Sequence, residues 1–383
     1  MATRFDGFAE EMGMAGFTYD KARIGKILGE IERRKKAAKD FVGDTRKVRA
    51  IAADGTFTVG FNQENPSAVL DASSELYGFN KNGQNQFADS LGIPRAFFDR
   101  MKAGAHLPEL AHLSNHLLET EPETKMFRTL DGDVRAVLST SYRTLDNADL
   151  FFLAADEFQK VGAEIWEARL SDDSFRLYAV QPGIQAEIRD EVKNGSHWTP
   201  EDGGNAGVDR HVAAVALQNS ETGRGSLQAR PCTLRMICAN WNVWDQSLTK
   251  IHLGKKRGEE GWISTHTQRL EDNVVWSKIR DIIKTAFNPA KFNEIIAKLQ
   301  GAKNDKTADP IQAVQATVEF CGLPETSLDS IRNKFVMDKD YSRYGLMQAV
   351  TFQAHGAATD EERDAWDDAG AKVLASPLKT ILR

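Results

Sequence analysis

Basic side chains and aromatic rings are interleaved in two segments of this chain, and the combination suits the binding of single-stranded nucleic acid. Cations contact the phosphates of such a strand, and flat rings stack on its bases. No acidic residue occurs from 222 to 243, and further cations follow at 250–257. We expect phosphate contacts from Arg128, Arg135, Arg143, Arg224, Arg230, Arg235, Lys255, Lys256 and Arg257, and base stacking from Tyr142, Trp241 and Trp244.

A structural interpretation of the same residues stays open. Arginines on strands are often solvated charges on the outer face of a sheet, and tryptophans usually belong to the core. The net charge of −6 and the pI of about 5.8 exclude a globally basic nucleic-acid binder, so any such function depends on local patches.

Other chemistry has weaker support. His112 and His116 lie one helical turn apart but lack the HExxH pattern, and no G-x-S-x-G or G-x-x-x-x-G-K-[ST] motif occurs. Cys238 has apolar neighbours, which favours a buried thiol over a nucleophile. We therefore expect binding rather than catalysis, with no cofactor and no metal. A metal-dependent nuclease stays a lesser alternative because acids cluster in one segment, at Asp131, Asp133, Asp146 and Asp149.

The composition is that of a globular protein, with 41% hydrophobic and 27% charged residues among 383. The three cysteines form no CxxC pair and suit a reducing compartment. The first residues contain acids where a signal peptide needs an apolar core, and no apolar run approaches the ~18 residues of a membrane span. We expect a cytoplasmic protein without membrane contact.

Alternation and turn signals predict hairpins in the first two thirds of the chain. Asp-Gly pairs at 54–55 and 131–132 mark two hairpin turns, in the segments 46–61 and 125–139. Two more hairpins are predicted at 163–181 and 211–238. Residues 85–101 are predicted to form two helices joined by a turn at Gly92-Ile93-Pro94. Apolar periodicity predicts further helices at 107–118, 147–161, 266–286, 290–300, 309–321, 326–335, 342–354 and 359–375. The fold class is therefore α+β, with a central, mostly antiparallel sheet flanked by helices and a helical C-terminal third.

Three regions follow from these elements: an N-terminal helical arm at 1–40, a central α+β domain at 41–300 and a C-terminal helical region at 301–383. The arm has an apolar stripe formed by Ile24, Ile27, Leu28 and Ile31, which is typical of a helix that packs on the protein's own core or, less commonly, on a neighbouring subunit. We expect a linker at 301–310 and a glycine-rich loop at 193–210.

Four sequence blocks carry a resemblance to a known family. They are FADSLGIPRAFFDRM (87–101), RTLDGDVRAVLSTSYRTLDNADL (128–150), QNSETGRGSLQARPCTLRMICANW (218–241) and SRYGLMQAVTFQAH (342–355). In this order they resemble the phage and plasmid-like proteins of domain-of-unknown-function family 932. The chain departs from the family at 238–242, where Cys-Ala-Asn-Trp-Asn stands in place of Cys-Thr-Asn-Gly-Met.

The resemblance implies a phage or plasmid protein in a bacterial host cell. Hairpins followed by a helix are also the element order of phage-type single-strand DNA annealing proteins, which act as homo-oligomers and need no catalytic residue. The leading hypothesis is therefore single-stranded DNA binding, extending to annealing and recombination, by a homo-oligomer. The alternative is a non-catalytic structural or host-interaction protein of a phage or plasmid.

Overall fold

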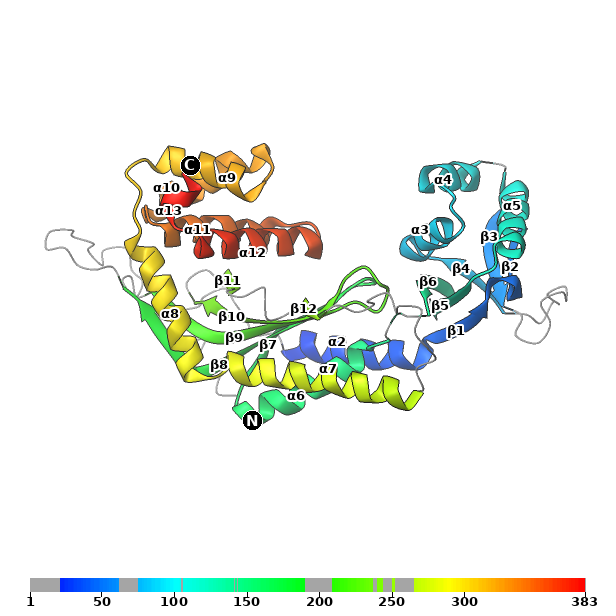
Figure 1. The fold of residues 1–383 in the computed structure, drawn as a ribbon, viewed down its shortest axis with the longest axis horizontal. Helices are drawn as coiled ribbons and strands as arrows, with labels where there is room; N and C mark the ends of the chain where they lie inside the picture. Colours follow the sequence, from blue (N-terminus) through cyan, green and yellow to red (C-terminus); the bar gives the residue numbers. More distant parts are fainter. Residues whose placement is uncertain are drawn as a thin grey trace, which may run out of the picture.

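The structure is a computed structural model that describes residues 21–61, 75–104, 106–140, 142, 144–189, 209–236, 240–243, 250–251 and 265–382. These residues form two sheets that lie side by side, with a layer of C-terminal helices above one of them (Figure 1). The α+β class, the mostly antiparallel pairing and the helical C-terminal region are confirmed. The predicted central sheet is divided in two.

The first sheet has the strand order β1-β5-β6-β4-β3-β2, and only the β4–β6 pair is parallel. Its strands are β1 (Lys39–Asp44), β2 (Val48–Ala53), β3 (Thr56–Phe61), β4 (Leu76–Phe79), β5 (Thr124–Leu130) and β6 (Asp133–Ser139); the short 3-10 helix η1 (Thr45–Lys47) joins β1 to β2. Both predicted Asp-Gly turns are confirmed, because all four of their residues have positive φ between 52° and 88°.

Three helices cover the first sheet: α3 (Lys81–Ser90), α4 (Arg95–Ala103) and α5 (Leu107–Thr120). Gly83 allows α3 to lie directly on β6, since a Cβ there would be 2.0 Å from the carbonyl oxygen of Val134. The core between helices and sheet is rich in phenylalanine, with Phe57, Phe87 and Phe98 in mutual ring contact.

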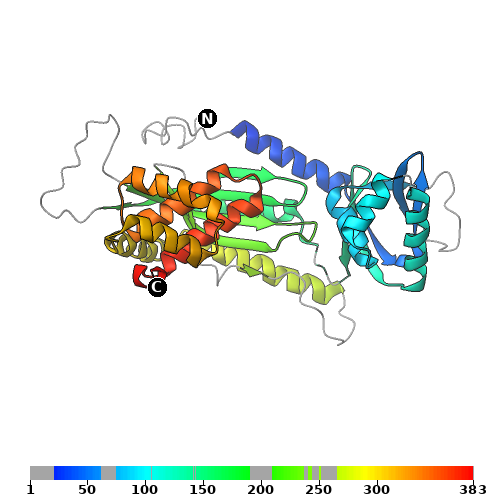
Figure 2. The ribbon, with the colours of Figure 1, turned by 90° about the horizontal axis from the view of Figure 1, so that it is seen from above.

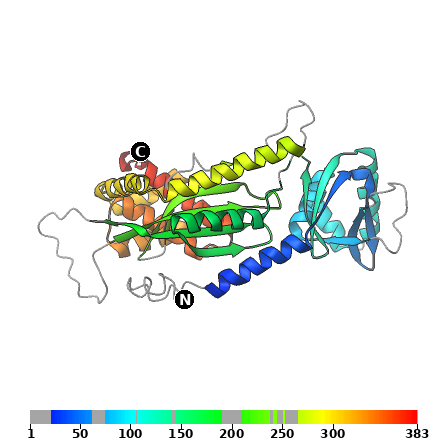
Figure 3. The ribbon, with the colours of Figure 1, turned by 90° about the horizontal axis from the view of Figure 1, so that it is seen from below.

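The second sheet is an antiparallel array in the order β11-β10-β9-β8-β7, with β12 paired to β10. Its strands are β7 (Glu164–Leu170), β8 (Phe175–Ile188), β9 (Asp209–Asn219), β10 (Leu227–Arg235), β11 (Asn240–Val243) and β12 (Lys250–Ile251). Three helices cover its lower face in Figure 1: α2 (Lys21–Ala37), α6 (Asn147–Val161) and α7 (Thr265–Ala286), which Figure 3 shows from below. The stripe of α2 packs on this core and Ile31 is buried, so the helix docks on its own chain.

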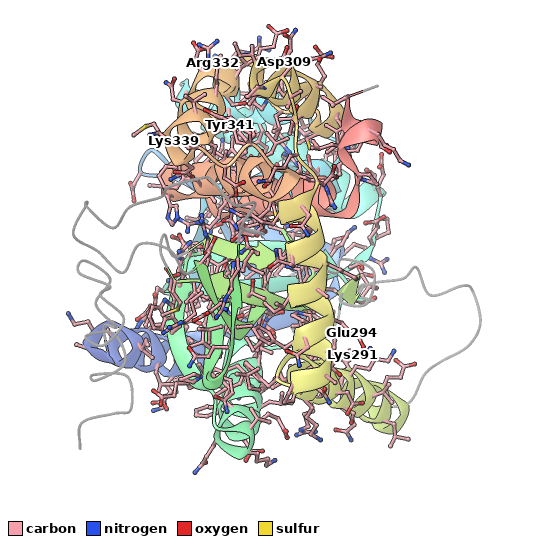
Figure 4. The ribbon with its side chains drawn as sticks, turned by 90° about the vertical axis from the view of Figure 1, so that its left-hand side faces the viewer. Lys291, Glu294, Asp309, Arg332, Lys339 and Tyr341 are labelled. Atoms are coloured by element: carbon pink, nitrogen blue, oxygen red, sulfur yellow. The ribbon has the colours of Figure 1, made fainter. Side chains whose placement is uncertain are left out.

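The C-terminal third contains α8 (Pro289–Asn304), α9 (Pro310–Cys321), η2 (Glu325–Ser327), α10 (Leu328–Asp338), α11 (Arg343–Phe352), η3 (Gln353–Gly356), α12 (Asp360–Ala375) and α13 (Leu378–Ile381). We call α9–α13 the C-terminal bundle. It lies over the upper face of the second sheet, and α8 runs up the end of that sheet to reach it (Figures 1, 2 and 4). The predicted linker at 301–310 is shorter than expected, since α8 continues to Asn304.

No helix among the described residues is long and apolar enough to span a bilayer.

Candidate nucleic-acid interface

Arg128 and Arg135 lie inside the fold. The Arg128 guanidinium is 3.0 Å from carboxylate oxygens of both Asp40 and Asp146, and its side chain is 3% exposed. Arg135 donates to Glu221 Oε2 at 2.7 Å. Burial opposes the charge of Arg128, but the two carboxylates outweigh burial and raise its pKa above the ordinary value. The structure therefore corrects the assignment of these two arginines as phosphate contacts, because carboxylates already neutralise them.

The partner of Arg135 belongs to the connection between β9 and β10, which we call the 220–222 loop. Glu221 Oε1 accepts a 2.7 Å hydrogen bond from the backbone N–H of Asn147, at the N-terminus of α6. The amide of Gln86 donates to the carbonyl oxygen of Thr222 at 2.8 Å. This loop therefore fastens the second sheet to the first sheet, which gives the NSETGRG block a structural role that residue types alone did not indicate.

The two predicted stacking rings that the structure describes are also engaged internally. Tyr142 donates its hydroxyl to the carbonyl oxygen of Ser220 at 2.6 Å, and burial raises the pKa of this tyrosine to about 12. Trp241 is 7% exposed and stacks on Tyr178, with ring centroids 4.5 Å apart. The expectation of two accessible rings is therefore corrected, because both rings pack within the protein.

Arg230 and Arg235 are both predicted phosphate contacts, but they are five residues apart on β10 and alternation places them on opposite faces. Arg230 pairs with Asp364 at 3.1 Å and Asp368 at 3.0 Å on one face. Arg235 pairs with Asp209 at 2.7 Å on the other. Both arginines have carboxylate partners, which corrects their assignment to one open phosphate track.

Arg224 keeps a partly open position. Its side chain is 44% exposed at the β9–β10 turn, 3.5 Å from a carboxylate oxygen of Asp173. The remaining predicted contacts lie outside the described residues; they are Arg143, Trp244, Lys255, Lys256 and Arg257.

A different cationic surface lies on the upper face of the second sheet. Cross-strand pairing aligns Arg169, Arg176 and Gln218 in one row, and Tyr178 and Arg230 in the next. We call this surface the arginine face; it comprises Arg169, Arg176, Tyr178, Gln218, Gln228, Arg230 and Trp241.

The sequence of β8 carries a signal for this face. In β8, Arg176 and Tyr178 alternate with Phe175 and Leu177, whose side chains enter the core below the sheet. Polar and apolar alternation is typical of a sheet with one face available to solvent or to a ligand. The face is nevertheless covered here, and Gln218 Oε1 is buried without a hydrogen-bond partner among the described residues.

Helix α12 supplies the cover. Asp364, Asp367 and Asp368 share one side of this helix, since positions three and four apart are neighbours. Asp364 receives both Nη atoms of Arg176 at 2.5 Å and also pairs with Arg230. Asp367 is 3% exposed, and burial raises its pKa to about 7 although the nearby Arg230 acts in the opposite direction. An acidic helix thus faces a cationic sheet.

A closed polar cluster joins the bundle to the far end of the second sheet. Tyr344 of α11 is 2.7 Å from His211 Nε2 and donates to Asp209 at 2.6 Å. Burial lowers the pKa of His211 to about 4, so the ring is neutral near pH 7. Thr233 contacts the other ring nitrogen at 3.1 Å. All of these groups have partners, and the cluster is structural.

Three of the four acids proposed as metal ligands are engaged in ion pairs. Asp131 pairs with Arg33 at 2.7 Å, Asp146 with Arg128 at 3.0 Å, and Asp149 with Lys35 at 2.7 Å. Within the described part of the chain, no group of three or more His, Cys, Asp or Glu side chains could hold a metal ion.

Neither a protein-family model nor a curated protein nor a solved structure matches this chain. The relation to domain-of-unknown-function family 932 therefore stays an expectation based on the four sequence blocks.

Proposed function

We propose that this protein binds single-stranded nucleic acid as a homo-oligomer, in the cytoplasm of a bacterial host, and that it belongs to a phage or plasmid system. Annealing of complementary strands is the activity that such binding would serve. The proposal needs no catalytic residue, because backbone neutralisation and exposure of bases are sufficient for annealing.

The arginine face is the observation that carries the proposal. Arg169, Arg176 and Arg230 lie within a few strands of the stacked rings of Tyr178 and Trp241. Guanidinium groups bind phosphate oxygens bidentately, and neighbouring rings offer flat surfaces to bases. Once α12 no longer covers it, the face would offer both kinds of contact, with Arg176 and Tyr178 in place of Arg128 and Tyr142.

The order of elements gives a second line of support. The antiparallel strands β7 to β12 of the second sheet are followed along the chain by the 22-residue helix α7, which packs against β9 and β10. Hairpin strands followed by a helix are the element order on which the comparison with annealing proteins rests. It is an analogy of architecture and supports the proposal without identifying a site.

Fluorescence anisotropy of a labelled single-stranded oligonucleotide tests the proposal. We expect binding that weakens from low to physiological salt and exceeds binding to the matched duplex. Each phosphate contact contributes about 0.7 to the slope of log K against log salt for a single strand. Replacing Lys255, Lys256 and Arg257 by alanine should therefore reduce the slope by about 2.

A control with the same charge change separates local contacts from net charge. Lys278, Lys298 and Lys379 are exposed on α7, α8 and α13, and their triple alanine variant should retain the wild-type slope. Equal slopes for the two triple variants would remove Lys255, Lys256 and Arg257 from the interface, and no binding by the wild-type protein at low salt would refute the proposed function.

The alternative function is a structural or host-interaction protein, and one observation favours it. Apolar side chains are exposed on α10 and at both ends of α11: Val336, Met337, Tyr341 and Phe352 are 37–77% exposed. Figure 4 shows Tyr341 in the connection between α10 and α11. Light scattering with and without oligonucleotide distinguishes the two functions, because assembly that ignores nucleic acid favours the alternative.

A further inference from the structure

We propose that α12 is an internal competitor for nucleic acid, with its carboxylates occupying the phosphate positions of the arginine face. This inference rests on the proposed function and deepens it, because it states how the binding surface is regulated. A bound single strand of nucleic acid and α12 then exclude each other from the arginine face. Binding therefore requires the C-terminal bundle to separate from the second sheet.

The ion pairs have the geometry that a phosphodiester would use. Asp364 bridges two arginines, with oxygens 2.5 Å from Arg176 and 3.1 Å from Arg230. Asp368 adds a second contact to Arg230 at 3.0 Å. A guanidinium presents the same planar pair of donors to a carboxylate and to a phosphate. A polyanion can therefore replace these carboxylates without any change in the sheet.

The contact between bundle and sheet contains buried ion pairs, which join Asp364 and Asp368 to Arg176 and Arg230. Apolar residues under the bundle, such as Cys232 and Leu234, cluster with Tyr178 and Trp241, and Ile188 of β8 joins the core of the bundle. That core is completed by α8 and is centred on buried residues such as Phe335. Buried ion pairs recover their hydration when an interface opens, so they resist separation less than an apolar contact of the same size. The bundle can consequently move as a folded unit.

The attachments that remain include the hydrogen bond that Gln348 of α11 donates to Asn242 of β11 at 3.3 Å and a polar group at the α8 end. Tyr344, at the start of α11, contacts His211 and Asp209, and Lys303 of α8 pairs with Asp340 at 2.9 Å nearby. The short connection between α11 and α12 makes these helices antiparallel neighbours. Asp364, near the start of α12, is therefore remote from Tyr344, and we infer a hinge at the α8 end and opening at the Asp364 end.

A double variant that removes two carboxylate charges tests the competition. Asp364→Asn together with Asp368→Asn keeps side-chain size but weakens the pairs with Arg176 and Arg230. Affinity for a labelled single-stranded oligonucleotide should rise about tenfold over wild type at the same salt. The matched control is Glu319→Gln with Glu325→Gln, which removes two exposed acids of α9 and η2 and should leave affinity within twofold of wild type.

A second measurement uses the wild-type chain and does not depend on the folding of a variant. Hydrogen exchange of α12 should accelerate when the oligonucleotide is bound, because the helix has left the sheet. Unchanged protection of α12 at saturating oligonucleotide would overturn the inference while leaving the proposed function intact. Failure of both wild type and the Asp364/Asp368 variant to bind at low salt would overturn both.

Discussion

Glu221 is the residue on which the two sheets depend most directly. One of its carboxylate oxygens accepts from Arg135 and the other accepts from the backbone N–H of Asn147. The negative charge is also favourable at the N-terminus of α6, where the helix dipole is positive. A single side chain thus compensates a buried cation, caps a helix and fixes the relative position of the sheets.

Replacement of Glu221 by glutamine should lower the free energy of unfolding by about 3 kcal/mol, because it leaves the charge of Arg135 buried and uncompensated. Urea unfolding followed by circular dichroism measures this loss. Glu319→Gln, at an exposed position of α9, provides the control and should change stability by less than about 0.5 kcal/mol. Equal midpoints for the two variants would contradict the role given to Glu221.

Asp367 makes stability depend on pH in an unusual direction. Burial raises its pKa to about 7, so the folded protein holds a proton that the unfolded chain releases near pH 4. The folded state binds more protons between these values, and stability therefore falls as pH rises from about 4 to 7.

The variant Asp367→Asn removes this component. Between pH 5 and pH 8 the wild type should lose about 2–3 kcal/mol more than the variant. The neutral His211, with its pKa lowered to about 4, affects both proteins alike and cancels in the comparison. Parallel pH profiles in urea unfolding would show that Asp367 is not the titrating group.

At the scale of elements, α2 belongs to the core of its own chain. Its stripe packs beside α6 and β7, and Ile31 is 3% exposed. Ile31→Ala should lower the free energy of unfolding by about 2–4 kcal/mol, as expected for a large buried side chain. The loss should be the same at 1 μM and at 50 μM protein; a dependence on concentration would instead place the stripe in a contact between subunits.

Local patterns predicted the elements well because their causes are local. The Asp54-Gly55 and Asp131-Gly132 turns follow from the positive φ that glycine and aspartate tolerate, and the periodic segments became helices near the predicted bounds. Whether the strands form one sheet or two depends on pairing between segments that are far apart in the sequence. The periodicity of a segment does not encode that pairing.

The candidate site was predictable only in its composition. Arg128 finds Asp40 at a separation of 88 residues, and Arg230 finds Asp364 at 134. No spacing rule connects such pairs, so exposed and internally paired arginines look the same in sequence. The place of Arg176 on the polar face could have been predicted, because Arg176 and Tyr178 alternate with the apolar Phe175 and Leu177 in β8.

At the scale of the molecule, the second sheet lies between two unlike layers. Below it, α2, α6 and α7 share a continuous apolar core with the strands. Above it, the core of the C-terminal bundle includes Ile188 of β8, and buried ion pairs join α12 to the sheet. The layer below and the layer above therefore differ in the free energy needed to separate them from the sheet.

Native-state hydrogen exchange should therefore resolve two cooperative units. Amides of α9–α12 should exchange through an opening of lower free energy than those of β8, β9 and β10. Moderate urea should reveal this difference before global unfolding dominates. Identical opening free energies across the bundle and the sheet would mean that they unfold as one unit and would weaken the case for a separable bundle.

The 220–222 loop also has a consequence for synthesis on the ribosome. Arg135 is translated 86 residues before Glu221, its carboxylate partner. At about 5–20 residues per second, the first sheet waits roughly 4–17 s for this partner. During that interval Arg135, in the emerging N-terminal half, lacks the carboxylate that pairs with it in the folded protein. Vectorial folding should therefore pause with the first sheet incomplete, and nascent chains stalled before residue 221 should be more sensitive to protease in β5 and β6 than chains stalled after 236.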